Sequence, residues 1–164
     1  MKLFINRDVS ASDTCFIIYD ELGRQKYHAV LKRSKHNVKK NNIKIDIIDE
    51  NKIITAKIRK LPIVGVNSFT LKNDMTALTL VIINAASGVQ CRFYGNNWHI
   101  CGDAVSKNFS IIDVDNAVIA VQRKQSGNYY ELEISDPAKE VMCLAASLCI
   151  NLINTVDKLA IQAV

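Results

Sequence analysis

Glycine, proline and tryptophan are scarce in this chain, whose 164 residues include six glycines, two prolines and one tryptophan. No low-complexity tract and no stretch rich in proline, glycine and serine interrupts it, so it has no segment with the composition of an interdomain linker. A chain of this length buries roughly 70% of its unfolded surface in one core. Residues 1–164 are therefore predicted to form a single domain, with strands at about 2–135 and a helix at about 137–159.

The five cysteines are odd in number and contain no Cys-x-x-Cys pair, which argues against a disulfide framework. Cys143 and Cys149 lie six residues apart in the predicted helix, on different faces, and are expected to fill the core. Met1-Lys2-Leu3 leads into a short strand-like run and not into the apolar core of a signal peptide. We expect a cytoplasmic protein, either free or peripheral at a membrane.

Motifs for catalysis, cofactors and metals are also lacking. His28, His36 and His99 are the imidazole bases of the sequence, and none stands in a recognisable nucleophile–base arrangement. There is no Gly-x-Gly-x-x-Gly or Walker-type loop. Cys91, His99 and Cys101 have the residue types of a metal site but lack the close pairing of one, so we predict buried or half-buried strand residues. We expect no enzyme, no cofactor and no metal.

What the sequence does contain is a long apolar stretch near its C-terminus, at residues 140–157. Asp136 is a predicted helix N-cap, and Pro137 stands at the first helical position, where its missing N–H is not needed. Within residues 141–150 the only polar side chain is that of Ser147. A helix that is apolar all round must be enclosed by protein or lipid.

Polar residues interrupt this helix before it reaches the roughly 20 apolar residues of a membrane span, so burial inside the fold is predicted. Ser147, Asn151, Asn154 and Lys158 are spaced i, i+4, i+7 and i+11, which places them on one stripe of the helix. One side of the helix is therefore expected to meet water or polar backbone near its exit.

Before the helix, short runs rich in isoleucine, valine, phenylalanine and tyrosine are bounded by aspartate, asparagine or glycine, which are strand and turn signals. Strands are predicted at 3–6, 14–19, 25–31, 43–48, 52–60, 66–71, 78–83, 89–94, 98–102, 108–112, 117–124 and 128–134, with a weaker candidate at 36–40. Tight turns between them favour a sequential antiparallel meander. Residues 113–116 are similar to the start of a calcium loop but lack its later glycine and glutamate, so a hairpin turn is predicted.

An internal repeat sharpens this prediction. Ile47-Ile48-Asp49 followed by Ala56 recurs as Ile111-Ile112-Asp113 followed by Ala120, with a constant offset of 64 positions. A duplicated antiparallel unit followed by an apolar helix predicts two half-sheets closed around that helix, since closure removes the sheet edges. The predicted fold is mainly β: a closed antiparallel barrel of about twelve strands, built from two pseudo-symmetric halves around a central hydrophobic C-terminal helix.

The hairpin pattern at 16–23, the segment 98–103 leading to 109–113, the strand end at Arg123-Lys124 and the terminal helix resemble the LURP-one-related group of the tubby C-terminal-like superfamily. This superfamily also includes the phospholipid scramblases. The resemblance covers nearly the whole chain, contains no catalytic motif and implies a small, single-domain member with a twelve-stranded barrel around a central helix. Members often carry an acidic residue after the apolar run of that helix, where this chain has Asn151.

The resemblance implies less about function. Tubby proteins proper bind phosphoinositide headgroups through basic residues on the barrel and have been linked to transcription. Scramblases carry a membrane-associated helix and a calcium-linked acidic segment, and that segment has no clear counterpart here. No tubby lysine matches a particular lysine of this sequence, so no lipid-binding residue is transferred from the family.

The basic residues are unevenly placed. The net charge is +5, and no acid occurs between Glu21 and Asp46. This interval supplies the candidate residues for an anionic ligand, which are Lys32, Arg33, Lys35, Lys39, Lys40 and Lys44. Such a block suits phosphates of a nucleic acid or of an anionic membrane.

Three hypotheses follow from this block. The first is a non-catalytic module that binds anionic phospholipid or phosphoinositide headgroups, with Arg59, Lys60, Arg123 and Lys124 as further contributors. The second is nucleic-acid binding, which is less favoured because few aromatic residues stand among the bases to stack on nucleotides. The third is a protein-interaction scaffold in which the basic segment only keeps the protein soluble.

Overall fold

The computed structural model describes residues 1–7, 14–32, 43–86 and 88–161 and contains twelve strands and one α-helix in these ranges. The strands are β1 (Lys2–Asn6), β2 (Thr14–Tyr19), β3 (Gln25–Leu31), β4 (Lys44–Asp49), β5 (Ile54–Leu61), β6 (Asn67–Lys72), β7 (Ala77–Ala85), β8 (Gly88–Tyr94), β9 (His99–Asp103), β10 (Asn108–Ile112), β11 (Val118–Lys124) and β12 (Tyr129–Ile134). A short 3-10 helix, η1 (Pro137–Lys139), leads into the helix α1 (Glu140–Ile161).

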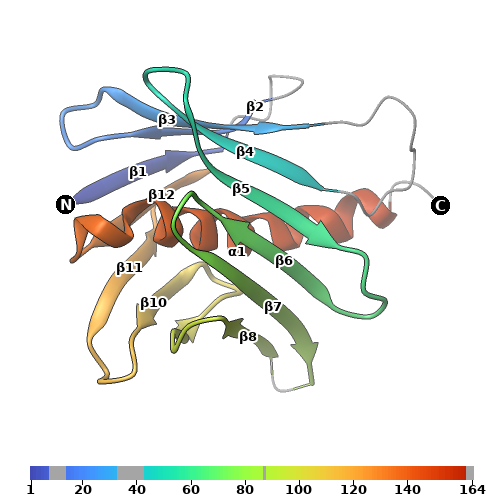
Figure 1. Cartoon of the computed structure of the whole chain (residues 1–164). Helices are drawn as coiled ribbons and strands as arrows, with labels where there is room; N and C mark the ends of the chain where they lie inside the picture. The colour runs from blue at the N-terminus through green and yellow to red at the C-terminus, as the bar shows by residue number, and fades with distance from the viewer. Residues whose placement is uncertain (8–13, 33–42, 87, 162–164) are drawn as a thin grey trace.

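The strands form one closed antiparallel barrel (Figure 1). Each strand pairs with the next in the chain, and β1 closes the barrel against β12, where Leu3 lies opposite Leu132. The sequence-based predictions of a meander and of a closed twelve-stranded barrel are confirmed. All twelve predicted strands are found within a few residues of their expected bounds, while the weaker candidate at 36–40 lies outside the described residues.

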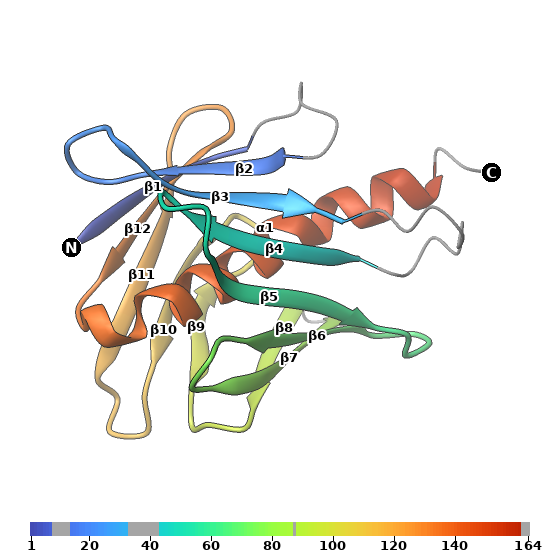
Figure 2. The ribbon, with the colours of Figure 1, turned by 45° about the horizontal axis from the view of Figure 1, so that its top comes forward.

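Helix α1 runs along the inside of this barrel (Figure 2). Its side chains from Met142 to Ile153 are buried on nearly every face, and Cys143 and Cys149 are both fully buried, as predicted for core-filling residues. Every second side chain of a strand points inward and packs against the helix. Residues of β7 accordingly alternate between buried and partly exposed positions. No helix in the described part of the chain has both the length and the apolar content needed to cross a bilayer.

The entry into the helix is built as the sequence predicted. The Asp136 side chain accepts a hydrogen bond from the Ala138 N–H at 3.0 Å, with Pro137 at the first position. The first turn is 3-10, and the α-helix then begins at Glu140. The Glu140 carboxylate is buried and lies 2.7 Å from the Lys26 ammonium. A negative charge at this end of the helix suits the helix dipole.

The internal repeat corresponds to equivalent hairpins. In β4–β5, Ile47 pairs with Ala56 and the register shifts at the next residue; in β10–β11, Ile111 pairs with Ala120 and the register shifts at the same place. Such shifts are β-bulges, which bend a strand and increase its twist. The two halves of the barrel therefore curve in the same way at equivalent positions.

The turns of these hairpins are equivalent as well. The Lys52 N–H donates to the Asp49 carbonyl at 3.0 Å, and the Asn116 N–H donates to the Asp113 carbonyl at 3.0 Å. Lys52 and Asn116 both have positive φ, of 65° and 57°. Residues 113–116 thus form the predicted hairpin turn.

Because neighbouring strands are antiparallel, all connections gather at two ends of the barrel. At the entry end, where α1 begins, lie the turns β2–β3, β4–β5, β6–β7, β8–β9 and β10–β11. At the exit end, toward which α1 runs, lie the connections β1–β2, β3–β4, β5–β6, β7–β8, β9–β10 and β11–β12. These names are kept below.

Gly102 provides a test of how closely the strands approach in this barrel. Its φ is 110°, and an added Cβ would lie 2.8 Å from the Asn108 carbonyl oxygen and 3.0 Å from the Phe109 Cα. We expect Gly102→Ala to lower the free energy of unfolding by about 3 kcal/mol or more, because backbone strain and a backbone clash add.

The matched control is Gly23→Ala, in the β2–β3 turn. Gly23 also has a positive φ, of 74°, but an added Cβ would meet nothing within 4 Å. It should cost about 1 kcal/mol from backbone strain alone. Urea unfolding of both variants measures the difference, and equal losses would contradict the close strand packing at Gly102.

Candidate anion-binding end of the barrel

The two ends of the barrel carry opposite charges. The entry end, counted as its turns, the β12–α1 connection and the residues flanking each, has nine acids, namely Asp20, Glu21, Asp49, Glu50, Asp74, Asp113, Asp115, Asp136 and Glu140, against five bases, namely Arg24, Lys26, Lys52, Lys72 and Lys139. On the same count, the described residues of the exit end include one acid, Asp103, and a larger set of bases, namely Arg7, Lys32, Lys44, Lys60, Lys107 and Lys124. Arg123 and Glu133 pair at 2.9 Å between β11 and β12 and are left out of both counts. The charge asymmetry therefore runs along the barrel.

Turn geometry explains why the entry end is acidic. The Asp20 carboxylate accepts hydrogen bonds from the Leu22 and Arg24 N–H groups, each at 2.9 Å. Such side-chain-to-backbone bonds favour aspartate at the start of tight turns. The backbone bond from Arg24 is the main cause that lowers the pKa of Asp20 below its ordinary value. Asp49 closes its turn in the same way, since its carboxylate accepts from the Asn51 and Ile53 N–H groups at 2.9 Å.

Lys32 and Lys44, the two described members of the predicted basic set, lie side by side at the exit end. The Lys32 N–H donates to the Lys44 carbonyl at 2.7 Å, and both residues are exposed. Arg33, Lys35, Lys39 and Lys40 lie outside the described residues. The chain segment that carries them starts and ends at this hydrogen-bonded pair.

Two further candidates are already paired with carboxylates. Arg59 lies 2.8 Å from the buried Asp46 carboxylate and also donates to main-chain carbonyls of β4 and β5. Arg123 lies 2.9 Å from Glu133 and 3.4 Å from Glu131. Because their charge is balanced within the fold, we leave both arginines out of the candidate site.

Lys107, which the sequence did not single out, lies inside the barrel at the exit end. It is only 4% exposed, and its ammonium donates to the Ile150 carbonyl of α1 at 2.7 Å. Burial is the main cause that lowers its pKa from 10.5 to about 8, and the nearby positive charges of Arg7 and Lys124 act in the same direction. No local pattern marked it, because Lys107 lies in the β9–β10 turn with a φ of 66°, where strand alternation does not apply.

Lys107 borders a polar network that connects β11 to the helix. The Gln122 side chain accepts from the Ser147 hydroxyl and from the Asn151 amide at 3.2 Å, and donates to the Asn151 oxygen at 2.9 Å and to the Lys107 carbonyl at 3.0 Å. The helix stripe was expected to meet water or polar backbone, but at Ser147 and Asn151 it meets the Gln122 side chain instead. The side chains of the stripe beyond Ile153 lie outside the described residues.

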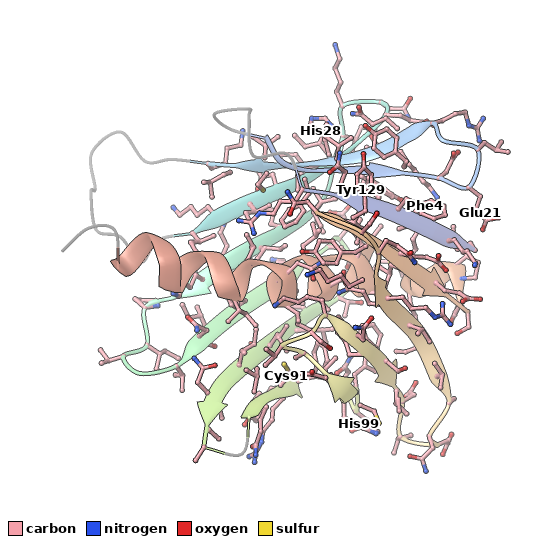
Figure 3. The ribbon with its side chains drawn as sticks, turned by 180° about the vertical axis from the view of Figure 1, so that it is seen from behind. Phe4, Glu21, His28, Cys91, His99 and Tyr129 are labelled. Atoms are coloured by element: carbon pink, nitrogen blue, oxygen red, sulfur yellow. The ribbon has the colours of Figure 1, made fainter. Side chains whose placement is uncertain are left out.

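The strand register separates the three residues considered as metal ligands. Arg92 pairs with His99, so Cys91 points to the opposite face of the sheet from His99 (Figure 3). Cys91 packs against the core, and burial raises the pKa of its thiol to about 11, whereas Cys101 is exposed. Among the described residues, no group of three His, Cys, Asp or Glu side chains is placed to hold a metal ion.

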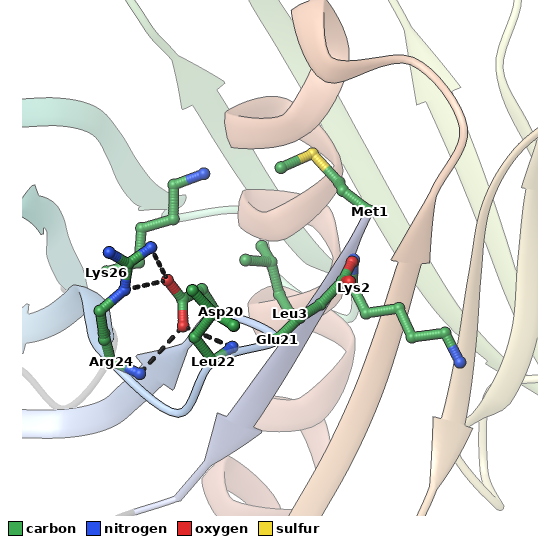
Figure 4. Close-up of a pocket in the computed structure, with 8 residues that line it drawn as sticks. All are labelled: Met1, Lys2, Leu3, Asp20, Glu21, Leu22, Arg24 and Lys26. Carbon is green, nitrogen blue, oxygen red and sulfur yellow. Dashed lines mark hydrogen bonds and ion pairs between the residues drawn. The ribbon is translucent and has the colours of Figure 1, made fainter.

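A hollow of about 210 Å³ lies at the entry end, between β1 and the β2–β3 turn (Figure 4). Its polar groups already bind one another: the Arg24 guanidinium pairs with Asp20 at 2.8 Å, and the Glu21 carboxylate accepts the Lys2 N–H. A polar ligand would have to replace these bonds, so this hollow is a weaker candidate than the exit end.

Comparison with known proteins supports the fold alone. No protein-family model matches the sequence, and no curated protein sequence matches it. The crystal structure of a protein from Arabidopsis thaliana is similar, with a TM-score of 0.56 and 11% sequence identity over 94% of this chain and 91% of that one. At this identity the similarity extends to the barrel architecture.

The buried Lys107 charge predicts a specific dependence of stability on pH. In the folded state its pKa is about 8, against 10.5 when unfolded, so the unfolded chain binds the proton more tightly between these values. The buried charge then destabilises the fold by roughly 3 kcal/mol below pH 8, and this effect fades as the pH rises from about 8 to 10.5.

We expect Lys107→Met to be more stable than the wild type by about 1–2 kcal/mol at pH 7, because the lost bond to Ile150 offsets part of the gain. The advantage should vanish near pH 10.5. Urea unfolding at both pH values measures it, with the exposed Lys72→Met as the control. A stability difference that does not change with pH would contradict the buried ammonium.

Proposed function

We propose that this protein is a non-catalytic binding module that docks the exit end of its barrel on anionic phospholipid or phosphoinositide headgroups at a membrane surface. The observation that carries the proposal is the separation of charge, with Lys32 and Lys44 exposed at one end and the acids at the other. The resemblance of the sequence to the tubby and LURP-one-related group, part of which binds phosphoinositides, supports the same ligand class. Such a protein would be cytoplasmic and peripheral at the membrane.

Electrostatic attraction would both strengthen membrane binding and orient the barrel on the membrane. A lysine or arginine near an anionic membrane contributes about 1 kcal/mol, and the effect fades within a Debye length of about 8 Å at physiological salt. Lys32 and Lys44 are both exposed and are joined by a backbone hydrogen bond of 2.7 Å, so two bases lie at one place on the exit end. The acidic entry end is repelled by the same surface, so the barrel would approach with its exit end first.

The choice of lipid over nucleic acid comes from the residue types. The segment between Lys32 and Lys44 contains no phenylalanine, tyrosine or tryptophan, so it lacks the rings on which unpaired bases stack. Lys32 and Lys44 carry compact ammonium groups, which act as point charges toward phosphates rather than reading a base edge. A charged surface of phosphates matches these groups best.

The test compares two double variants with the same net charge. Lys32→Gln/Lys44→Gln removes exposed bases at the exit end, and Lys57→Gln/Lys72→Gln removes an exposed cross-strand pair on β5 and β6, away from that end. In co-sedimentation with phosphatidylcholine vesicles containing phosphatidylserine or a phosphoinositide, we expect the first variant to bind about tenfold more weakly or worse. The second should stay close to the wild type.

Further measurements identify which residues and which interaction cause any binding to vesicles. A Lys39→Gln/Lys40→Gln variant extends the test to the middle of the basic segment. Raising the salt should weaken vesicle binding, and neutral vesicles should bind poorly. Equal loss in the two matched variants, or no binding to anionic vesicles at low salt, would overturn the proposal. Tighter binding to DNA or RNA at equal salt would favour the nucleic-acid alternative.

A further inference from the structure

The connection between β5 and β6 exposes two apolar side chains at the exit end. Val64 is 99% exposed and Ile63 is 51% exposed. Pro62 follows the last residue of β5, the Ile63 N–H donates to the Leu61 carbonyl at 2.9 Å, and Gly65 has a φ of 82°. These features make a short turn whose apolar tip is half exposed at Ile63 and almost fully exposed at Val64.

The tip lies next to the basic residues of the candidate site. The Lys60 N–H donates to the Ile43 carbonyl at 2.8 Å, and Lys44 pairs with Arg59, so the end of β5 lies beside the start of β4. Beyond this point the β5–β6 turn extends from the barrel, on the same side as the C-terminal part of α1 (Figure 2). An apolar tip therefore projects from a basic rim.

Val105, in the β9–β10 connection, is a further exposed apolar residue of the exit end, at 50%. The exposed apolar tips of the entry end have different surroundings. Leu22, Ile53, Met75 and Val114 are 75%, 60%, 95% and 62% exposed, and all of them stand in the acidic turns of the entry end. An anionic bilayer would repel that end, since like charges approach at a cost. Of the two ends, only the exit end combines exposed apolar residues with a basic rim.

We infer that Ile63 and Val64 insert into the headgroup–acyl boundary of an anionic bilayer when the exit end docks. This inference rests on the proposed function and deepens it, because it assigns the short-range part of binding to the β5–β6 turn. The bases supply attraction that salt weakens, whereas burial of apolar side chains adds affinity that depends little on salt. The two contributions can therefore be separated by experiment.

Insertion can be observed with a tryptophan placed at the tip. The native Trp98 is 9% exposed and packs edge-on against Phe93, with ring centroids 5.8 Å apart, so it contributes a constant background. We expect Val64→Trp to show a blue-shifted emission on binding phosphatidylcholine–phosphatidylserine vesicles, and quenching by lipids brominated on their acyl chains. The control Met75→Trp, equally exposed at the entry end, should show neither change.

Serine variants measure how much the apolar tip contributes to the affinity for vesicles. We expect Ile63→Ser/Val64→Ser to bind these vesicles about tenfold more weakly at every salt concentration, with an unchanged salt dependence. Leu22→Ser/Met75→Ser is the matched control and should bind as the wild type does. The Lys32→Gln/Lys44→Gln variant, in contrast, should have a shallower salt dependence.

The outcomes distinguish the two proposals. Salt-dependent vesicle binding without shielding or quenching of Val64→Trp would overturn insertion and leave headgroup binding standing. No binding of the wild-type protein to anionic vesicles would overturn both. Equal shielding of the Val64→Trp and Met75→Trp variants would show that binding has no preferred end, which also contradicts insertion by the β5–β6 turn.

Discussion

The enclosure of one apolar helix is the constraint on which this structure depends. A helix whose side chains are buried from Met142 to Ile153 cannot face water on any side, and a closed sheet both surrounds it and removes the strand edges. Closure requires β1, the first strand, to pair with β12, the last. The fold therefore depends on contacts between the two ends of the strand region as well as on local hairpins.

Polar groups inside such a barrel must find partners there, because an unpaired buried polar group is costly. Gln122 meets Ser147 and Asn151, and Lys107 meets the Ile150 carbonyl. These bonds connect β11 and the β9–β10 connection to one face of the helix. The network adds specific polar contacts to the close packing that holds the helix in place.

In this twelve-stranded barrel, the side chains available for binding lie mainly at the two ends. Along the strands, inward side chains pack in the core and outward ones form cross-strand pairs. At the entry end, aspartates close the turns through bonds to backbone N–H groups, as Asp20 does. The exit end carries the exposed Lys32 and Lys44, together with the exposed Ile63–Val64 tip. The function proposed here belongs to that end.

Much of this architecture could be predicted from the sequence because its signals are local. The N-cap at Asp136, the helix that follows it and the turns that bound the strands each arise from neighbours in the chain, and the repeat of Ile47 at Ile111 indicated the paired halves. Only the tertiary structure decided which polar residues meet. Lys107 looked like an ordinary turn residue until barrel closure placed its ammonium against α1. This contact joins residues far apart in the chain, whose approach local patterns cannot specify.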